Sequence, residues 1–128
     1  TTCGKRMSFS FGGDWNFLYS RWQAIPSDTD VVVTHLPPLG IFDCAWGSKY
    51  SNKEKCKICG EVHEKYAHWG CAQLLREVRE RIKPKVHLFG HVHDDVGFQY
   101  DEKHGVLFVN SAMDIFSKAH RIKVIFDQ

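Results

Sequence analysis

The sequence contains no apolar run long enough to cross a membrane, and its first residues show no hydrophobic segment typical of a signal peptide. It also has no large excess of one charge, because 17 Lys and Arg residues are opposed by 15 Asp and Glu residues, for a net charge of +2. This balance gives no electrostatic basis for binding nucleic acid or an anionic membrane. We therefore expect an intracellular, cytoplasmic protein that binds neither.

Internal repeats, low-complexity tracts and linker-like stretches are absent as well, which excludes a solenoid or multidomain organisation for these residues. A hydrophobic content of 43% and an aromatic content of 13% are typical of a folded chain. Residues 1–128 are predicted to form one α/β domain. Because the chain begins "TTCGKR" without a Met, we interpret it as a fragment or a processed form.

The predicted elements follow from hydrophobic periodicity and from the residues that interrupt it. One amphipathic helix is expected, with its apolar face built by Cys71, Leu74, Leu75, Val78 and Ile82 and its end set by Pro84. The segment 15–22 is ambiguous, with one or two helical turns expected, and 41–68 is read as a long irregular connection. Strands are predicted at 5–11, 31–35, 86–90 and 120–127, and a hairpin is predicted from 96–100 and 105–110.

Histidines follow two of these predicted strands directly. His35 ends the strand "VVVTH", while His91 and His93 come just after "VHLFG". A connection through a helix makes the two strands parallel and adjacent, so their carboxyl ends meet at one edge of the sheet, where α/β proteins bind ligands. We therefore expect the three imidazoles to converge there as ligands of a divalent metal ion, Mn, Fe or Zn. The plain alternative is that each is an ordinary surface or hydrogen-bonded histidine.

The segments that carry these histidines resemble the C-terminal half of a calcineurin-like metallophosphoesterase. The resemblance rests on "VVVTHLPPLG", on "GC" before the amphipathic helix, on "PKVHLFGHVHDDVG" and on "FVNSA". With "GGDWNF" and "IPSDTD" it covers roughly residues 5–128 apart from the loop 48–66, and it is nearest to the small metallophosphoesterase-domain-containing proteins known from brain. The family fold is a β-sandwich flanked by helices, with a two-metal site at the sheet edge.

The resemblance implies roles for individual residues. His35 and His91 would bind one metal ion and His93 the other, and the two ions would activate a bridging water to attack a phosphodiester or nucleotide, including cyclic nucleotides. Asp94 and Asn110 would support these ligands from outside the coordination sphere.

The chain also departs from the family pattern. The family's D-x-H, G-D and G-N-H segments, which carry the bridging Asp and the acid His, precede the part that this chain resembles. Gly13-Asp14 aligns better with a Gly-rich turn than with G-D, and Leu36 replaces a usual Gly at the pocket rim. We therefore expect a truncated domain that holds at most one metal ion weakly and hydrolyses slowly or not at all. Its uncovered apolar sheet would favour self-association or a partner.

The cysteines suggest a second site. There are five, an odd number that does not suit a disulfide framework and indicates a reducing compartment. The stretch "CKICGEVHEKYAHWGC" contains the C-x-x-C-G form of a zinc knuckle, in which Cys56 and Cys59 grip a structural zinc ion. The other two ligands are sought among His63, His68, Cys44 and Cys71, of which we select His68 and Cys71. The alternatives are reduced loop cysteines and, for Cys71, a buried helix position.

Two functions from different classes follow from these sites. The first is a metal-dependent phosphoesterase that uses the histidine edge. The second is a non-catalytic zinc-binding interaction module that is derived from the same fold and acts through the loop 44–71.

Overall fold

A computed structural model describes residues 15–47 and 53–113. This part of the chain combines helices with short strands, which makes it mixed α/β, and none of its helices has the length and apolar character needed to cross a membrane. The elements are α1 (Trp15–Gln23), β1 (Val31–Val33), β2 (Cys44–Trp46), β3 (Tyr66–His68), α2 (Ala72–Arg76), the π-helical η1 (Glu77–Ile82), β4 (Val86–Phe89), β5 (Gly97–Asp101) and β6 (Val106–Asn110). The strands predicted at 5–11 and 120–127 lie outside the described residues.

The described part of the main sheet has four strands in the order β1-β4-β6-β5. β1 runs parallel to β4, so the predicted adjacency of the two histidine-bearing strands is confirmed. β4 is also parallel to β6, and β5 and β6 form the predicted antiparallel hairpin. The β-sandwich that the family resemblance implies stays a prediction.

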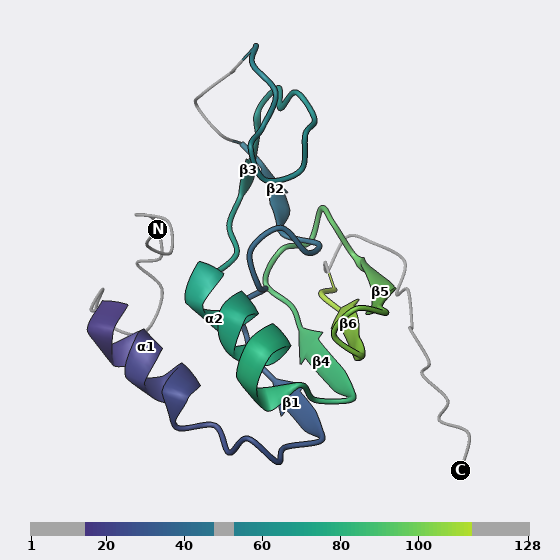
Figure 1. The fold of residues 1–128 in the computed structure, drawn as a ribbon. Coiled ribbons are helices and arrows are strands. Elements are labelled where there is room, and N and C mark those ends of the chain that lie inside the picture. The colour runs from purple at the N-terminus through teal and green to yellow at the C-terminus, as the bar shows by residue number, and fades with distance from the viewer. Residues whose placement is uncertain (1–14, 48–52, 114–128) are drawn as a thin grey trace.

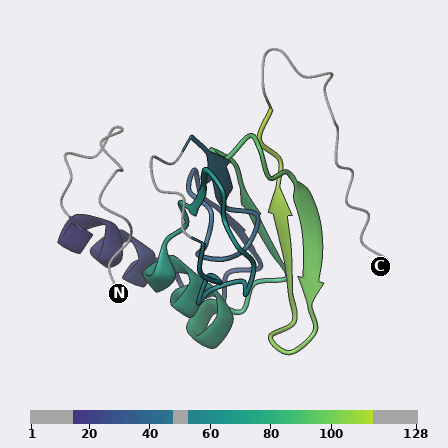
Figure 2. The same ribbon diagram turned by 90° about the horizontal axis from the view of Figure 1, so that it is seen from above.

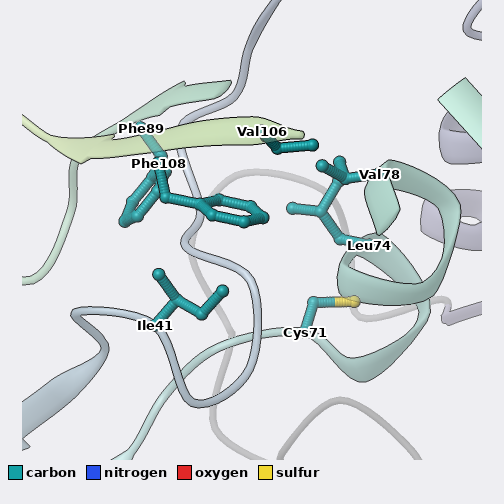
Figure 3. Close-up of a cluster of buried hydrophobic side chains, with 7 residues drawn as sticks. All are labelled: Ile41, Cys71, Leu74, Val78, Phe89, Val106 and Phe108. Carbon is teal, nitrogen blue, oxygen red and sulfur yellow. The ribbon is translucent and has the colours of Figure 1, made fainter. Parts of the chain in front are cut away.

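The hydrophobic core lies between this sheet and the helix that connects β1 to β4. Leu74 and Val78 point from α2 and η1 toward Phe89 and Phe108 of the strands (Figure 3). The helix predicted over 71–83 forms, but its second half widens into a π-helical turn that ends when the Lys83 N–H donates to the Val78 carbonyl. Its apolar period still buries one face, as amphipathic patterning requires.

The ambiguous segment 15–22 is helical and forms most of α1. Figure 2 shows α1 and α2 on the same side of β5 and β6, and α1 packs against α2. The Arg81 guanidinium joins the end of α1 to η1, since it donates to the carbonyls of Trp22 and Ile25 at 3.1 and 2.8 Å. Trp22 also packs against the core.

The segment 41–68 is not the irregular connection that the sequence predicted. Its two ends pair as the antiparallel hairpin β2–β3, with Ala45 opposite Ala67. This hairpin projects from the sheet and carries the Cys/His loop at its tip (Figure 1). Each strand has only three residues, and Ala45 is the one fully buried side chain of the two strands, so no regular hydrophobic alternation indicates them in the sequence.

Apolar side chains are exposed on both outer strands of the described part of the main sheet. Val33 on β1 is 71% exposed and Phe98 on β5 is 66% exposed. This agrees with the expectation of uncovered apolar sheet surface, while self-association itself stays a prediction.

His87 is fully buried on β4 between the rings of Phe89 and Phe108. Its Nε2 lies 2.9 Å from the Thr34 hydroxyl, whose single proton is donated to the Leu36 carbonyl at 2.6 Å. The hydroxyl must therefore accept from His87, which places the imidazole proton on Nε2 and leaves the buried Nδ1 without a hydrogen-bond partner. Burial lowers the pKa of His87 from 6.5 to about 3, so the ring is neutral in the folded chain.

This arrangement predicts a loss of stability in acid. As the pH falls from 6.5 toward 3, the unfolded His87 takes up a proton that the folded state excludes. The free energy of unfolding should therefore fall by roughly 1 kcal/mol for each pH unit in that window. Urea unfolding across the range measures this slope, and His87→Leu should flatten it. An equal slope in the parent chain and in His87→Leu would contradict the assignment.

Candidate metal centres

Two of the three predicted histidine ligands meet at the carboxyl edge of β1 and β4. The pairing of these strands continues beyond their ends, since the Gly90 N–H donates to the His35 carbonyl at 3.3 Å. This register places His35 Nε2 3.0 Å from His91 Nδ1, with ring centroids 4.8 Å apart. The expected meeting of side chains from the two strand ends is therefore present for this pair.

His91 is held in an uncommon backbone conformation. Its φ of 70° lies in the left-handed region, which non-glycine residues adopt at some cost. The ring of Trp69 lies beside it, with centroids 5.8 Å apart. Burial, together with the nearby His35 and His93, lowers the pKa of His91, so the neutral imidazole that metal ions require is favoured.

His93 does not complete a cluster with this pair. Its side chain is exposed, and His35, His91 and His93 do not form a group whose ligand atoms all lie within 4.8 Å of one another. No Asp or Glu in residues 15–47 and 53–113 joins His35 and His91 in such a group either. Asp14 lies outside the described residues.

Asn110 fixes the backbone of the loop that carries these histidines. It is fully buried at the end of β6, and its Nδ2 lies 2.8 to 3.0 Å from the carbonyls of Val92, Asp95 and Phe42. Its Oδ1 accepts the N–H of Ala112. Asn110 therefore positions the loop through its main chain and has no contact with an imidazole among these hydrogen bonds.

Asp94 and Asp95 join the histidine loop to the β2–β3 hairpin. The Asp94 carboxylate accepts the Trp46 N–H at 2.9 Å, and the Asp95 carboxylate accepts the Cys44 N–H at 3.1 Å. Asp94, for which an outer-shell role was predicted, thus supports the neighbouring β2 strand.

The second candidate centre lies at the tip of the hairpin. Cys56, Cys59, His63 and His68 each offer one sulfur or nitrogen, and these atoms all lie within 4.8 Å of one another. Cys59 Sγ and His63 Nε2 are already 3.0 Å apart. This Cys/His cluster could hold a metal ion.

A tight turn directs backbone N–H groups toward the thiol of Cys56 and so favours its thiolate form. The Ile58 N–H points at Cys56 Sγ at 3.3 Å, and the Gly60 N–H donates to the Cys56 carbonyl at 2.8 Å. Gly60 has a φ of 78°, which an L side chain would strain. Burial raises the pKa of Cys56, but the N–H groups of Cys59 and Ile58 outweigh it and lower the pKa to about 6.

The buried carboxylate of Asp43 orients His68. His68 Nδ1 lies 2.6 Å from Asp43 Oδ1, and the hydrogen bond to Asp43 raises the pKa of His68 to about 9 against the opposing effect of burial. The other ring nitrogen, Nε2, is buried and has no hydrogen-bond partner. His68 is also a member of the Cys/His cluster.

The structure replaces one of the zinc ligands selected from the sequence. Cys71 is not a member of the Cys/His cluster, because it is fully buried in the hydrophobic core at the start of α2. His63 is the fourth member instead. The spacing C-x-x-C-x-x-x-H could have indicated it, since His63 follows Cys59 by four residues within the same loop.

Comparison with known proteins supports the family resemblance. A UPF0046 protein of Caenorhabditis elegans is 39% identical over 101 residues, covering 74% of this chain and 25% of the relative. Human metallophosphoesterase domain-containing protein 1 is 34% identical over 84 residues, covering 66% of this chain and 21% of the relative. No model of a known protein family matches the chain.

These relatives and the paired histidines at the sheet edge define the class: the chain is related to the metallophosphoesterases. Within that class its similarity is to the metallophosphoesterase-domain-containing and UPF0046 proteins. The chain spans about a quarter of the length of the curated relatives it matches.

The role of Asn110 in fixing the histidine loop predicts a large effect of a small change. Asn110→Asp replaces the donating amide with an oxygen that faces three carbonyl oxygens, and it should destabilise the fold by roughly 2–5 kcal/mol. Gln99→Glu makes the same chemical change at an exposed position of β5 and should alter stability by less than about 0.5 kcal/mol. Chemical denaturation of both variants provides the measurement, and similar values for the two would contradict the assigned role.

Proposed function

We propose that the chain contributes one side of a metal-dependent phosphoesterase site. His35 and His91 bind one divalent ion, either Mn, Fe or Zn, and by family resemblance His93 would bind the second ion. The substrate is a phosphodiester or nucleotide, with cyclic nucleotides included by family resemblance. The metal supplies a Lewis acid and lowers the pKa of a bound water.

The distance between the two imidazole nitrogens is the observation that carries this proposal. Neighbouring ligands of one octahedral ion with bonds of about 2.1 Å lie about 3 Å apart. His35 Nε2 and His91 Nδ1 are 3.0 Å apart. An ion that binds both nitrogens therefore needs little rearrangement of either ring.

The surroundings of the pair also support a functional role. The left-handed conformation of His91 is the kind of backbone strain that concentrates at binding sites. Three carbonyls held by Asn110 keep the loop in place against that strain. Trp69 beside His91 adds an apolar wall.

The three histidines carry no negative charge, and this limits how many metal ions they can bind without further ligands. Two ions about 3.5–4 Å apart need an anionic bridge to offset their repulsion, and neutral imidazoles supply none. We propose that the 128-residue chain holds at most one ion at this edge, weakly, and that its hydrolysis of phosphodiesters is slow or absent.

A non-catalytic metal-binding module is the second candidate function. The Cys/His cluster favours it, because it has four ligand residues and leaves no position open for a substrate. Substitution of His91 and of Cys56 separates the two functions. Phosphodiester hydrolysis would depend on His91, whereas metal binding by the module would depend on Cys56.

Titration with Mn²⁺ tests the enzyme reading, since this paramagnetic ion prefers nitrogen and oxygen ligands to thiolates. The resonances of His35 and His91 should broaden together at substoichiometric Mn²⁺, and His91→Ala should abolish the effect at His35. His104→Ala, which changes a histidine in the β5–β6 turn, should leave it intact. Turnover of a chromogenic phosphodiester that survives His91→Ala combined with His93→Ala would refute the proposal.

A further inference from the structure

We propose that Cys56, Cys59, His63 and His68 bind one structural zinc ion, which Asp43 supports through His68 and which fastens the β2–β3 hairpin beside the histidine edge. The four residues form a closed Cys₂His₂ set of the kind that structural zinc sites use. The inference does not depend on hydrolysis at the other site.

The cluster needs only a small adjustment to accept the ion. Ligand atoms around a tetrahedral zinc lie roughly 3.3 to 3.8 Å apart, given bonds of about 2.0 to 2.3 Å. The four ligand atoms of the cluster all lie within 4.8 Å of one another, and Cys59 Sγ and His63 Nε2, at 3.0 Å, need only to move slightly apart. The loop is exposed at Cys59 and Ile58, so it can close without disturbing the core.

His68 provides an observation that points to a ligand independently of the spacing. Its side chain is 8% exposed, yet Nε2 has no hydrogen-bond partner. Nδ1 is held by Asp43, so a bound ion at Nε2 would complete the carboxylate–histidine–metal arrangement that is common around protein-bound zinc. A buried polar atom without a partner is otherwise unfavourable.

Asp43, Cys44 and His68 form a competing group of possible ligands. Geometry argues against this group, because the Asp43 carboxylate already accepts hydrogen bonds from the N–H groups of Gly40 and Gly70, which a metal ion would have to replace. Asp43 and the Cys44 thiol also both contact the same ring nitrogen, His68 Nδ1, at 2.6 and 3.6 Å, so an ion bound by this group would have to displace these contacts.

The proposed ion would also act on the neighbouring edge. It binds the end of β3 at His68, and the next residue, Trp69, lies against His91. The opposite strand, β2, is tied to the histidine loop through Asp94 and Asp95. Zinc would therefore order the hairpin and, through these contacts, limit the motion of the histidine loop.

The test uses the complete 128-residue chain, purified, stripped with a chelator and titrated with Zn²⁺ or Co²⁺. We expect one tightly bound equivalent of zinc by native mass spectrometry, retained when His91→Ala removes the weaker site at the histidine edge, together with a higher unfolding temperature on loading and a Co²⁺ spectrum of tetrahedral thiolate coordination. Hydrogen exchange at the amides of Cys44 and Trp46 should slow with zinc. No zinc binding, or an octahedral Co²⁺ spectrum, would overturn the proposal.

Matched variants identify the ligands. Cys56→Ser and His63→Ala should weaken zinc binding by more than the roughly 10–100-fold that removal of an outer-shell partner costs. Cys44→Ser and His93→Ala are the matched controls and should bind one equivalent as the parent does. Loss of zinc in Cys44→Ser with retention in Cys56→Ser would instead assign the ion to the competing group. Because the Co²⁺ spectrum of the parent chain reports the ligand set directly, the proposal stays testable even if a variant fails to fold.

Asp43→Asn tests the supporting role of the carboxylate. Because Asp43 positions His68 without binding the ion, the substitution should lower the affinity for zinc roughly 10–100-fold and leave the tetrahedral Co²⁺ spectrum unchanged. An unchanged affinity in the folded variant would remove Asp43 from the proposal.

Discussion

The carboxylate of Asp43 joins the turn after β1 to the end of β3 and the start of α2, which follow it by 25 and 27 residues along the chain. It is 1% exposed and accepts the N–H groups of Gly40 and Gly70 at 3.0 and 2.9 Å, besides its contact with His68. A buried carboxylate is unfavourable without such donors, so moving any of these segments away from Asp43 would cost free energy. The turn after β1, the end of the hairpin and the start of α2 are therefore one structural unit.

This unit explains why two different candidate centres lie so close together. In an extended chain, successive side chains point in opposite directions, so His68 and Trp69 leave the end of β3 on opposite sides. His68 reaches the Cys/His cluster, and Trp69 lies against His91. Gly70 then permits the close approach of the preceding segment, because a Cβ there would lie 2.4 Å from the Pro38 carbonyl oxygen.

The sequence was sufficient to predict the histidine edge, because that edge follows from simple rules. Two apolar strands joined through an amphipathic helix are parallel, and their carboxyl ends meet, which brings His35 to His91. His93 could not be placed by the same rule, because the left-handed turn at His91 redirects the chain and no strand period indicates it. Asn110 was identified as a supporting residue, but only the structure shows that it supports backbone carbonyls.

The hairpin could not be predicted, because the interactions that define it are not local. β2 is held by Asp94 and Asp95, which are 48 and 51 residues away along the chain, and its side chains carry no clear alternation. The structure does not bring Cys71, which we selected as a zinc ligand, into the Cys/His cluster, for a related reason. Its position at the start of an amphipathic helix already indicated burial in the core, and the nearer His63 lay in the loop that the cysteines form.

The two proposed centres differ in the charge of their ligands, and this difference separates their roles. Two thiolates neutralise a divalent ion, so a Cys₂His₂ site has little need of further anions and closes around the metal. Neutral imidazoles leave the whole positive charge of an ion at the His35–His91 edge. Such an ion is held weakly but attracts anionic oxygens, including those of a phosphodiester and of the carboxylates that bridge two metal ions. Ligand charge therefore makes the loop suited to structure and the sheet edge suited to chemistry.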